Sequence, residues 1–416
     1  MRLICRHIGW LLGGMLVLLF AGCASSSEEE KVVQPKEKPV LRLYVYAPDR
    51  PIVTRADIGD VAATTAENAV HSLHVWVFET GTDDLVGHVQ LTNPAMADQL
   101  DANNSSIVGQ TVTVPISDAF ATKLENGTAP GVDVYVAANV TPANCGLSLD
   151  GATTRTKLKE ALIEHKTAAD YFGVTALASL PSAVMDVPEG GLPMSGLLEN
   201  QTVTGTSPVY AVTPRVKLVR AVSKVRFIFT KASSVADDES LKVSAITLDD
   251  GVLPKQEYLL LEAPYTTDGR QSHVVSTGVS PYEAEATLVG EVGGSAINAC
   301  GTPTDYIYNV EDGAQAYETQ INGGLVTQEG HTAPDLSELG RLYLRESDKK
   351  LTGKIRYTTE SSEKTATFEM AEAGDFSRNH TWIVYAYFEG SGLLKVNVVN
   401  VKNWDADQGS HAVYNW

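Results

Sequence analysis

The sequence ends on LLKVNVVNVKNWD, residues 393–405, followed after a short turn by HAVYNW, residues 411–416. Both segments alternate in polarity and are rich in valine and aromatic residues, which is typical of β-strands. Most chains end in a polar, frayed tail. A terminal strand that carries Tyr414 and Trp416 instead needs an apolar groove, in its own domain or in another molecule. We predict a groove in another molecule, for reasons given by the N-terminus.

Residues 1–23 have the features of an export signal rather than of a folded segment. Two arginines supply the charged start, and the apolar run Ile8–Phe20 is too short, at about 13 residues, to span a bilayer stably. The run closes on Phe-Ala-Gly-Cys23, which resembles a bacterial lipobox with Phe in place of the usual Leu. We predict that Cys23 is lipidated; the alternative is a plain secretory leader that is cut nearby.

Length and charge limit the classes of function. A chain of 416 residues predicts two domains of roughly 150–200 residues each. The 51 acidic residues outnumber the 32 basic ones, for a net charge of −19, which argues against binding nucleic acid. Cys145 and Cys300 are the two cysteines outside the leader, and either a disulfide or two free thiols fits them. No CxxC motif supports a zinc ribbon.

The segment Val40–Tyr46 alternates cleanly and predicts a strand with Leu41, Leu43 and Val45 on one side. It leads into a turn-rich loop, residues 47–57, that contains two arginines. A proline follows the first arginine and obstructs a protease that cuts after Arg.

The second arginine of this loop, Arg55, is followed by Ala56. The Arg55–Ala56 bond is therefore the better candidate for proteolytic processing. The alternative is that both arginines are ordinary surface residues.

The rest of the chain consists of short alternating runs between Gly, Pro and Asp turns, which predicts antiparallel sandwiches rather than βαβ units. One helix is predicted at Lys157–Glu164, with Thr153 and Thr154 as caps. Arg215–Phe229 predicts a pair of strands, with a domain boundary near Pro214. The other predicted strands are Glu67–Phe78, Leu85–Leu91, Ser106–Ile116, Val132–Val140, Lys242–Leu248, His273–Ser276, Tyr306–Tyr308, Arg341–Arg345, Leu351–Thr358, Ser362–Glu369 and Trp382–Phe388.

The fold prediction is all-β, with two antiparallel β-sandwich domains and one or two short helices after a lipoprotein signal peptide. The predicted parts are a signal peptide over 1–22, a tether, strand and processing loop over 23–55, and sandwich domains over 56–213 and 214–416.

No catalytic motif occurs: GxSxG, HExxH, a Walker loop and an EF-hand loop are all missing from the sequence. His71 and His74 are three residues apart, so a strand would point them to opposite faces rather than toward one metal ion. The acidic pairs at 83–84 and 249–250 lie in turn contexts, where Asp is common. We predict no enzyme activity, no metal site and no cofactor.

The order of these features resembles the major fimbrial subunit family of Bacteroidales, the fimbrillins of type V pili. No single feature is specific to this family, but the order in which all of them occur along nearly the whole chain is specific to it. The features are the lipobox at Cys23, Val53–Ala56, Glu67–Phe78, Pro193–Gly196 ahead of Val216–Phe229, Ser377–Trp382, Val396–Trp404 and the terminal Trp416.

The resemblance implies two sandwich domains of transthyretin-like architecture and export to the outer membrane as a lipoprotein. It implies that an Arg-specific surface protease removes the N-terminal segment, after Arg55 in this sequence. The strand lost would be Val40–Tyr46, and a donor strand of another subunit would fill the groove. The donor would be His411–Trp416, through Ala412, Val413, Tyr414 and Trp416, with Leu394–Trp404 as its partner or hinge.

The expected function is that of a structural subunit, in the shaft, of a cell-surface fimbria that serves adhesion. The expected partners are further fimbrial subunits, including tip and anchor subunits, the Arg-specific protease, a receptor on a host or bacterial surface, and the outer membrane through the lipid before cleavage. The alternatives are a tip or accessory subunit, and a surface lipoprotein that binds glycan and never polymerises.

Overall fold

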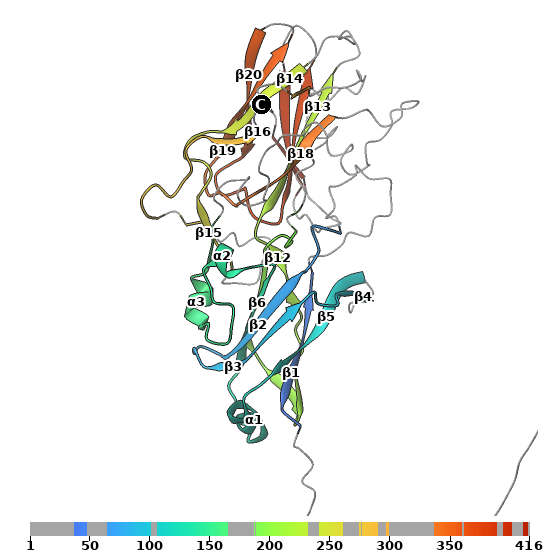
Figure 1. Ribbon diagram of the computed structural model, residues 1–416, viewed down its shortest axis with the longest axis vertical. Coiled ribbons are helices and arrows are strands. Elements are labelled where there is room, and N and C mark those ends of the chain that lie inside the picture. Colours follow the sequence, from blue (N-terminus) through green and yellow to red (C-terminus); the bar gives the residue numbers. More distant parts are fainter. Residues whose placement is uncertain are drawn as a thin grey trace, which may run out of the picture. The chain divides into compact units, whose positions relative to one another are not determined.

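The computed structural model describes residues 37–47, 65–100, 106–164, 187, 189–231, 241–260, 274–275, 277–289, 297–298, 337–359, 362–388, 394–401 and 411–414 (Figure 1). In these ranges the chain forms four main β-sheets and three short helices. The predicted all-β class is therefore confirmed. None of the helices in this part of the chain has the length and hydropathy of a membrane span.

Two sheets form the first sandwich. Sheet 1 has the strand order β4-β5-β1-β10-β9, with β11 also paired to β1. Its strands are β1 (Val40–Tyr46), β4 (Ala97–Leu100), β5 (Ser106–Pro115), β9 (Val203–Thr206), β10 (Val209–Val212) and β11 (Val216–Lys217). Sheet 2 has the order β12-β8-β6-β2-β3. Its strands are β2 (Ser72–Glu79), β3 (Leu85–Thr92), β6 (Val132–Ala138), β8 (Met194–Gln201) and β12 (Val219–Arg220).

Two further sheets form the second sandwich. Sheet 3 has the order β18-β13-β21-β22-β23, and sheet 4 the order β16-β14-β19-β20 with β17 also paired to β14. The strands of sheet 3 are β13 (Ser223–Lys231), β18 (Ser337–Leu344), β21 (Thr381–Phe388), β22 (Leu394–Val401) and β23 (His411–Tyr414). Those of sheet 4 are β14 (Leu241–Leu248), β16 (Ala286–Val289), β17 (Ile297–Asn298), β19 (Leu351–Thr359) and β20 (Ser362–Ala371).

Each sandwich has its own apolar core, formed by the inward side chains of its two sheets. Leu43 of β1 and Val75 of β2 belong to the first core. Phe227 of β13 and Ile355 of β19 belong to the second. Alternation along each strand puts every second side chain into such a core. The period-2 pattern of the sequence therefore located most of these strands.

Most strand pairs are antiparallel, as predicted, but each sandwich also contains parallel pairing. In sheet 1, β1 runs parallel to β10 and β11. In sheet 3, β13 runs parallel to β21. Alternation within a strand gives no information on the direction of its neighbour, so the sequence did not predict these pairs.

A small third core covers the other face of sheet 2. Trp76 and Tyr135 from the sheet pack there with Leu158, Ile163 and Leu259. The covering elements are α2 (Pro142–Cys145), α3 (Arg155–Lys159) and the two-stranded sheet of β7 (Leu162–Glu164) with β15 (Gln256–Tyr258). The remaining helix, α1 (Asp118–Glu125), was not predicted, although Ser117 caps it through a hydrogen bond from the Phe120 amide.

The predicted helix at Lys157–Glu164 is wrong over its second half. Thr154 does cap a helix, accepting a hydrogen bond from the Lys157 amide, but α3 ends at Lys159. The chain then forms β7, which pairs with β15 from far along the sequence. Pairing with a distant strand overrides the local helical spacing of the apolar residues.

The predicted strand pair over Arg215–Phe229 is also wrong. This run contains three strands that enter three different sheets: β11 in sheet 1, β12 in sheet 2 and β13 in sheet 3. The run therefore forms the passage from the first sandwich to the second. In the predicted strand His273–Ser276 only residues 274–275 are described, and there Val274 forms an isolated bridge to Glu257. The predicted strand Tyr306–Tyr308 lies outside the described residues.

Candidate functional site

The candidate site is the place that β1 occupies in sheet 1. β1 pairs with β5 over all seven of its residues, from Val40 opposite Pro115 to Tyr46 opposite Gly109. On its other side it pairs with β10 and then with β11. β1 is therefore an inner strand, and its absence would leave unpaired backbone groups on both neighbours.

Three side chains anchor β1 in the first core, as the alternation predicted. Leu41, Leu43 and Val45 are 0%, 2% and 0% exposed. Val112 and Val114 of β5 and Val216 of β11 belong to the same core. Without β1, these neighbours would line an apolar trench, which is the kind of groove that an extended segment fills.

The outer face of β1 carries a contact that the sequence did not reveal. The Arg215 guanidinium carbon lies 5.1 Å from the centre of the Tyr44 ring, a cation–π distance. Burial raises the pKa of the Tyr44 phenol, and the nearby Arg215 charge opposes that rise. A Cβ on Gly109 would lie 2.5 Å from Tyr44 Oη and 2.6 Å from the Val45 carbonyl oxygen. Only glycine fits at this position of β5 beside β1.

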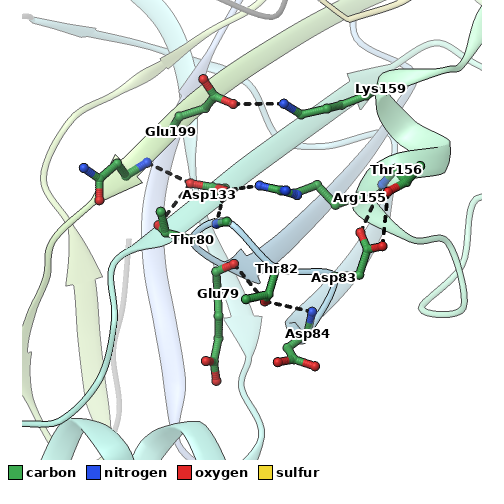
Figure 2. A network of polar contacts seen from close by, with 12 residues as sticks. Glu79, Thr80, Thr82, Asp83, Asp84, Asp133, Arg155, Thr156, Lys159 and Glu199 are labelled. Atoms are coloured by element: carbon green, nitrogen blue, oxygen red, sulfur yellow. Dashed lines mark hydrogen bonds and ion pairs between the residues drawn. The ribbon is translucent and has the colours of Figure 1, made fainter.

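Sheet 2 does not contain β1. Figure 2 shows the polar contacts around Asp133 in this sheet. Asp133 of β6 accepts hydrogen bonds from Thr80 Oγ1 at 3.0 Å, the Asn200 amide at 2.8 Å and Arg155 Nη1 at 3.0 Å. Burial raises the pKa of the Asp133 carboxyl, but these donors outweigh it and hold the pKa below the ordinary value. Asp133 thus ties β6 to the β2–β3 turn, β8 and α3.

The acidic residues at 83–84 lie in the connection between β2 and β3, consistent with the predicted turn context. Asp83 accepts hydrogen bonds from the backbone amide and hydroxyl of Thr156, both at 3.1 Å (Figure 2). Asp249 accepts from Thr352 and pairs with Lys354 at 2.9 Å.

His71, directly before β2, and His74, within β2, have different surroundings. His71 is exposed, whereas His74 is buried and stacks on Trp76, which also stacks on His88. Burial lowers the pKa of the His74 imidazole, and partial burial lowers the pKa of the half-buried His88 imidazole. Among the described residues no group of three or more His, Cys, Asp or Glu side chains could hold a metal ion.

The predicted donor strand lies at the far edge of sheet 3. β23 pairs with β22 over four residues, from His411 opposite Val401 to Tyr414 opposite Val398. It has no second neighbour among the described strands. Ala412 and Val413 lie within it, and Trp416 lies outside the described residues.

The other predicted site residues lie outside the described part of the chain: Cys23, Arg55 and Ala56. Cys145 is buried, has no disulfide partner among the described residues, and has a thiol pKa raised by burial. Cys300 is outside the described residues, so its pairing stays open.

Residues 51–244 match the family model of the major fimbrial subunit protein (FimA). The predicted resemblance to fimbrial subunits is thereby confirmed. The match includes Arg55 and the strands of the first sandwich after β1, and spans a little under half of the 416 residues. β1 and β23 both lie outside it.

Three solved structures illustrate the fimbrial likeness. They are a candidate cell adhesion protein of Parabacteroides distasonis (14% identity, 90% of this chain and 99% of that one, TM-score 0.48), the tip fimbrial protein Mfa3 of Porphyromonas gingivalis (13%, 91% and 100%, 0.45) and a fimbrial assembly protein of Parabacteroides distasonis (12%, 91% and 100%, 0.42). At these identities and TM-scores, none of them bears on function. No curated protein matches the chain.

Several charged residues that the sequence analysis did not single out are buried in the structure. Glu67, Arg220, Lys224 and Arg378 are fully buried. Charged residues are seldom buried unless paired, so sequence reasoning places them at the surface by default. Glu67 lay within a predicted strand but precedes β2, and its alternation gave no sign of an ion pair.

Proposed function

We propose that the protein is a structural subunit of the shaft of a cell-surface fimbria and polymerises by strand exchange. In this proposal the C-terminal strand of one copy takes the place of β1 in the next. The observation that carries the proposal is the inner position of β1, paired on both sides near the front of the chain.

The apolar burial expected in such an exchange supports the proposal. Leu41, Leu43 and Val45 are buried to within 2% exposure. Each fully buried apolar side chain contributes roughly 1.5–3 kcal/mol, so refilling the trench yields on the order of 5–10 kcal/mol before ordering costs. The backbone pairing of β1 with β5 sets the direction of the incoming strand, which must run antiparallel to β5.

β23 is the favoured donor because it is held more weakly than the strand before it. β22 pairs with β21 over eight residues and places Leu394, Val396 and Val398 in the second core. β23 has four paired residues and a single described neighbour. β22 would therefore stay in place while β23 leaves for another copy. A head-to-tail contact of this kind does not close on itself, so it builds a filament.

Processing would start the exchange. The precursor would reach the outer membrane as a lipoprotein attached through Cys23, with β1 filling its own groove and blocking assembly. An Arg-specific surface protease would cut after Arg55 and free β1 from the body. The released subunits would join other fimbrial subunits, tip and anchor included, and serve adhesion to a host or bacterial surface receptor.

Electron microscopy of the protein after Arg-specific proteolysis tests this proposal, with N-terminal sequencing of the product. We expect fibres whose subunits begin at Ala56. Fibres whose subunits keep a lipidated Cys23 would contradict processing. Folded monomers with an intact N-terminus and affinity for a sugar would instead favour the glycan-binding lipoprotein.

A further inference from the structure

The segment Glu67–His71, which begins shortly after the proposed cut, starts with two buried polar residues and ends at the exposed His71. Glu67 is 0% exposed, Asn68 5% and Val70 9%. The segment precedes β2 and belongs to no strand. A buried segment without a strand must satisfy its polar groups by other contacts.

The Glu67 carboxylate makes two contacts with the second sandwich. Oε2 lies 3.1 Å from Nζ of Lys224, which is in β13, and both side chains are 0% exposed. Oε1 accepts a hydrogen bond of 2.6 Å from the hydroxyl of Tyr343, which is in β18. These residues are 157 and 276 positions away in the sequence. Glu67 therefore links the start of the first sandwich to sheet 3.

Arg220, at the passage between the sandwiches, adds a second set of contacts. Its Nε donates to the Glu67 carbonyl oxygen at 3.1 Å. Its two terminal nitrogens donate to Asn68 Oδ1 and, at 2.8 Å, to Asn379 Oδ1. Asn379 follows Arg378 in the loop before β21. One buried guanidinium thus joins this segment to the second sandwich as well.

Asn139, directly after β6, fastens the same segment to sheet 2. Its Oδ1 accepts from the His71 amide at 2.8 Å. Its Nδ2 donates to the carbonyl oxygens of Ala69, at 2.8 Å, and Leu192, at 2.9 Å. The segment is therefore held from both sandwiches at once.

Buried ion pairs of this kind contribute geometry more than net stability. The desolvation of both charges offsets most of their attraction, but removing one partner leaves an uncompensated buried charge, which is strongly destabilising. The pair between Glu67 and Lys224 therefore penalises any arrangement in which the two sandwiches separate while each stays folded.

We propose that Glu67, Asn68, Arg220, Lys224 and Tyr343, the Glu67 clamp, couple the two sandwiches after β1 has gone. This inference rests on the proposed function. All five residues follow Arg55, so the cut leaves the clamp in the body of the subunit. Removal of β1 then opens sheet 1 without detaching sheet 1 and sheet 2 from the second sandwich. In a fibre, tension on the strand inserted in sheet 1 passes through the clamp to sheet 3.

Pulse hydrogen–deuterium exchange at increasing urea tests the coupling, on the full chain before and after Arg-specific cleavage. Peptides from β6 report the first sandwich and peptides from β21 the second. In the parent protein we expect both to lose protection at the same urea concentration, cut or uncut. In Glu67→Gln the β6 peptides should lose protection about 1 M urea earlier than those from β21, most clearly in the cut chain.

Glu79→Gln is the matched control, because it removes an ion pair whose lysine partner, Lys123, is 44% exposed. It should leave the two sets of peptides coincident. If Glu67→Gln does not fold, Tyr343→Phe removes only one hydroxyl group and should separate them in the same direction by less.

Two results would overturn the clamp: coincident loss of protection in the Glu67 or Tyr343 variants, or separate loss in the parent. A β1 that stays bound after cutting in the presence of other copies would contradict the proposed function instead. The clamp would then be tested by the same hydrogen–deuterium exchange measurement on the uncut chain alone.

Discussion

β1 and β13 are both inner strands, one in each sandwich. Each has an antiparallel neighbour on one side, β5 or β18, and a parallel neighbour on the other, β10 or β21. Each places apolar side chains in a core, Leu41, Leu43 and Val45 in one case and Val225 and Phe227 in the other. The sheet position alone therefore gives no reason to treat them differently.

The difference lies in how each strand is attached to the chain. β12 ends at Arg220, and β13 begins three residues later. A short connection therefore joins β13 to the first sandwich. β1 is joined to the rest of the body only through residues 47–71, which include Arg55. Position in a sheet sets how much a strand contributes to its core. Under the proposed exchange, connectivity sets which strand can leave. Three experiments bear on this distinction.

The largest expected effect comes from the donor. Deletion of His411–Trp416 should abolish fibre elongation completely, because the place of β1 then has no strand to fill it. The free energy of unfolding of the monomer should change by no more than about 1 kcal/mol, since β23 is a four-residue edge strand. Electron microscopy and urea unfolding measure the two effects. Fibres formed by the truncated protein would end the assignment of β23 as donor.

A charge placed in each strand tests whether β1 is exchanged and β13 is not. Leu43→Asp and Phe227→Asp should each lower the free energy of unfolding of the uncut chain by about 4 kcal/mol, through lost burial and a buried carboxylate. After β1 has been exchanged, only Phe227→Asp should still have an effect in urea unfolding.

Arg42→Asp is the control, because Arg42 is exposed on the same strand and its replacement should change stability by about 0.5 kcal/mol or less. A Leu43→Asp effect that persists in fibres would mean that β1 remains in sheet 1.

A smaller effect is expected at the neighbour of β1. Gly109→Ala places a Cβ against Tyr44 and the Val45 carbonyl, which should cost the uncut chain about 2 kcal/mol. The cost should fall when β1 is replaced by a strand without tyrosine at that position. Gly190→Ala is the control, since nothing lies within 4 Å of its Cβ position. Equal unfolding midpoints for Gly109→Ala and the parent would show that β5 adapts to the added methyl group.

The sequence predicted the strand content well because alternation is a local property. Val40–Tyr46 is a strand with the predicted bounds, and Leu351–Thr358 was predicted to within one residue of β19. The three residues of β1 predicted to share a face are buried together. Their predicted role in exchange, and the processing at Arg55, stay predictions.

The same reasoning could not predict where a segment with helical spacing forms a strand, nor which strands pair with each other. Leu158, Ala161 and Leu162 have the spacing of a helix face. Residues 162–164 nevertheless pair with β15, almost a hundred residues later. The run Arg215–Phe229 was predicted as a pair of strands, yet it contributes to three sheets. A local pattern shows that a segment is extended and which side is apolar; the partner that covers it is chosen by the whole chain.

The amino-acid sequence by itself determined the all-β class, most of the β-strands and the net negative charge, because each depends on composition or on a period of two residues. The export signal stays a prediction. Only the tertiary structure decided that β1 lies between two neighbours while β23 has one among the described strands, and that Glu67 meets Lys224 in the interior. Such contacts join residues far apart in the chain, where burial and pairing are set by packing rather than by local spacing.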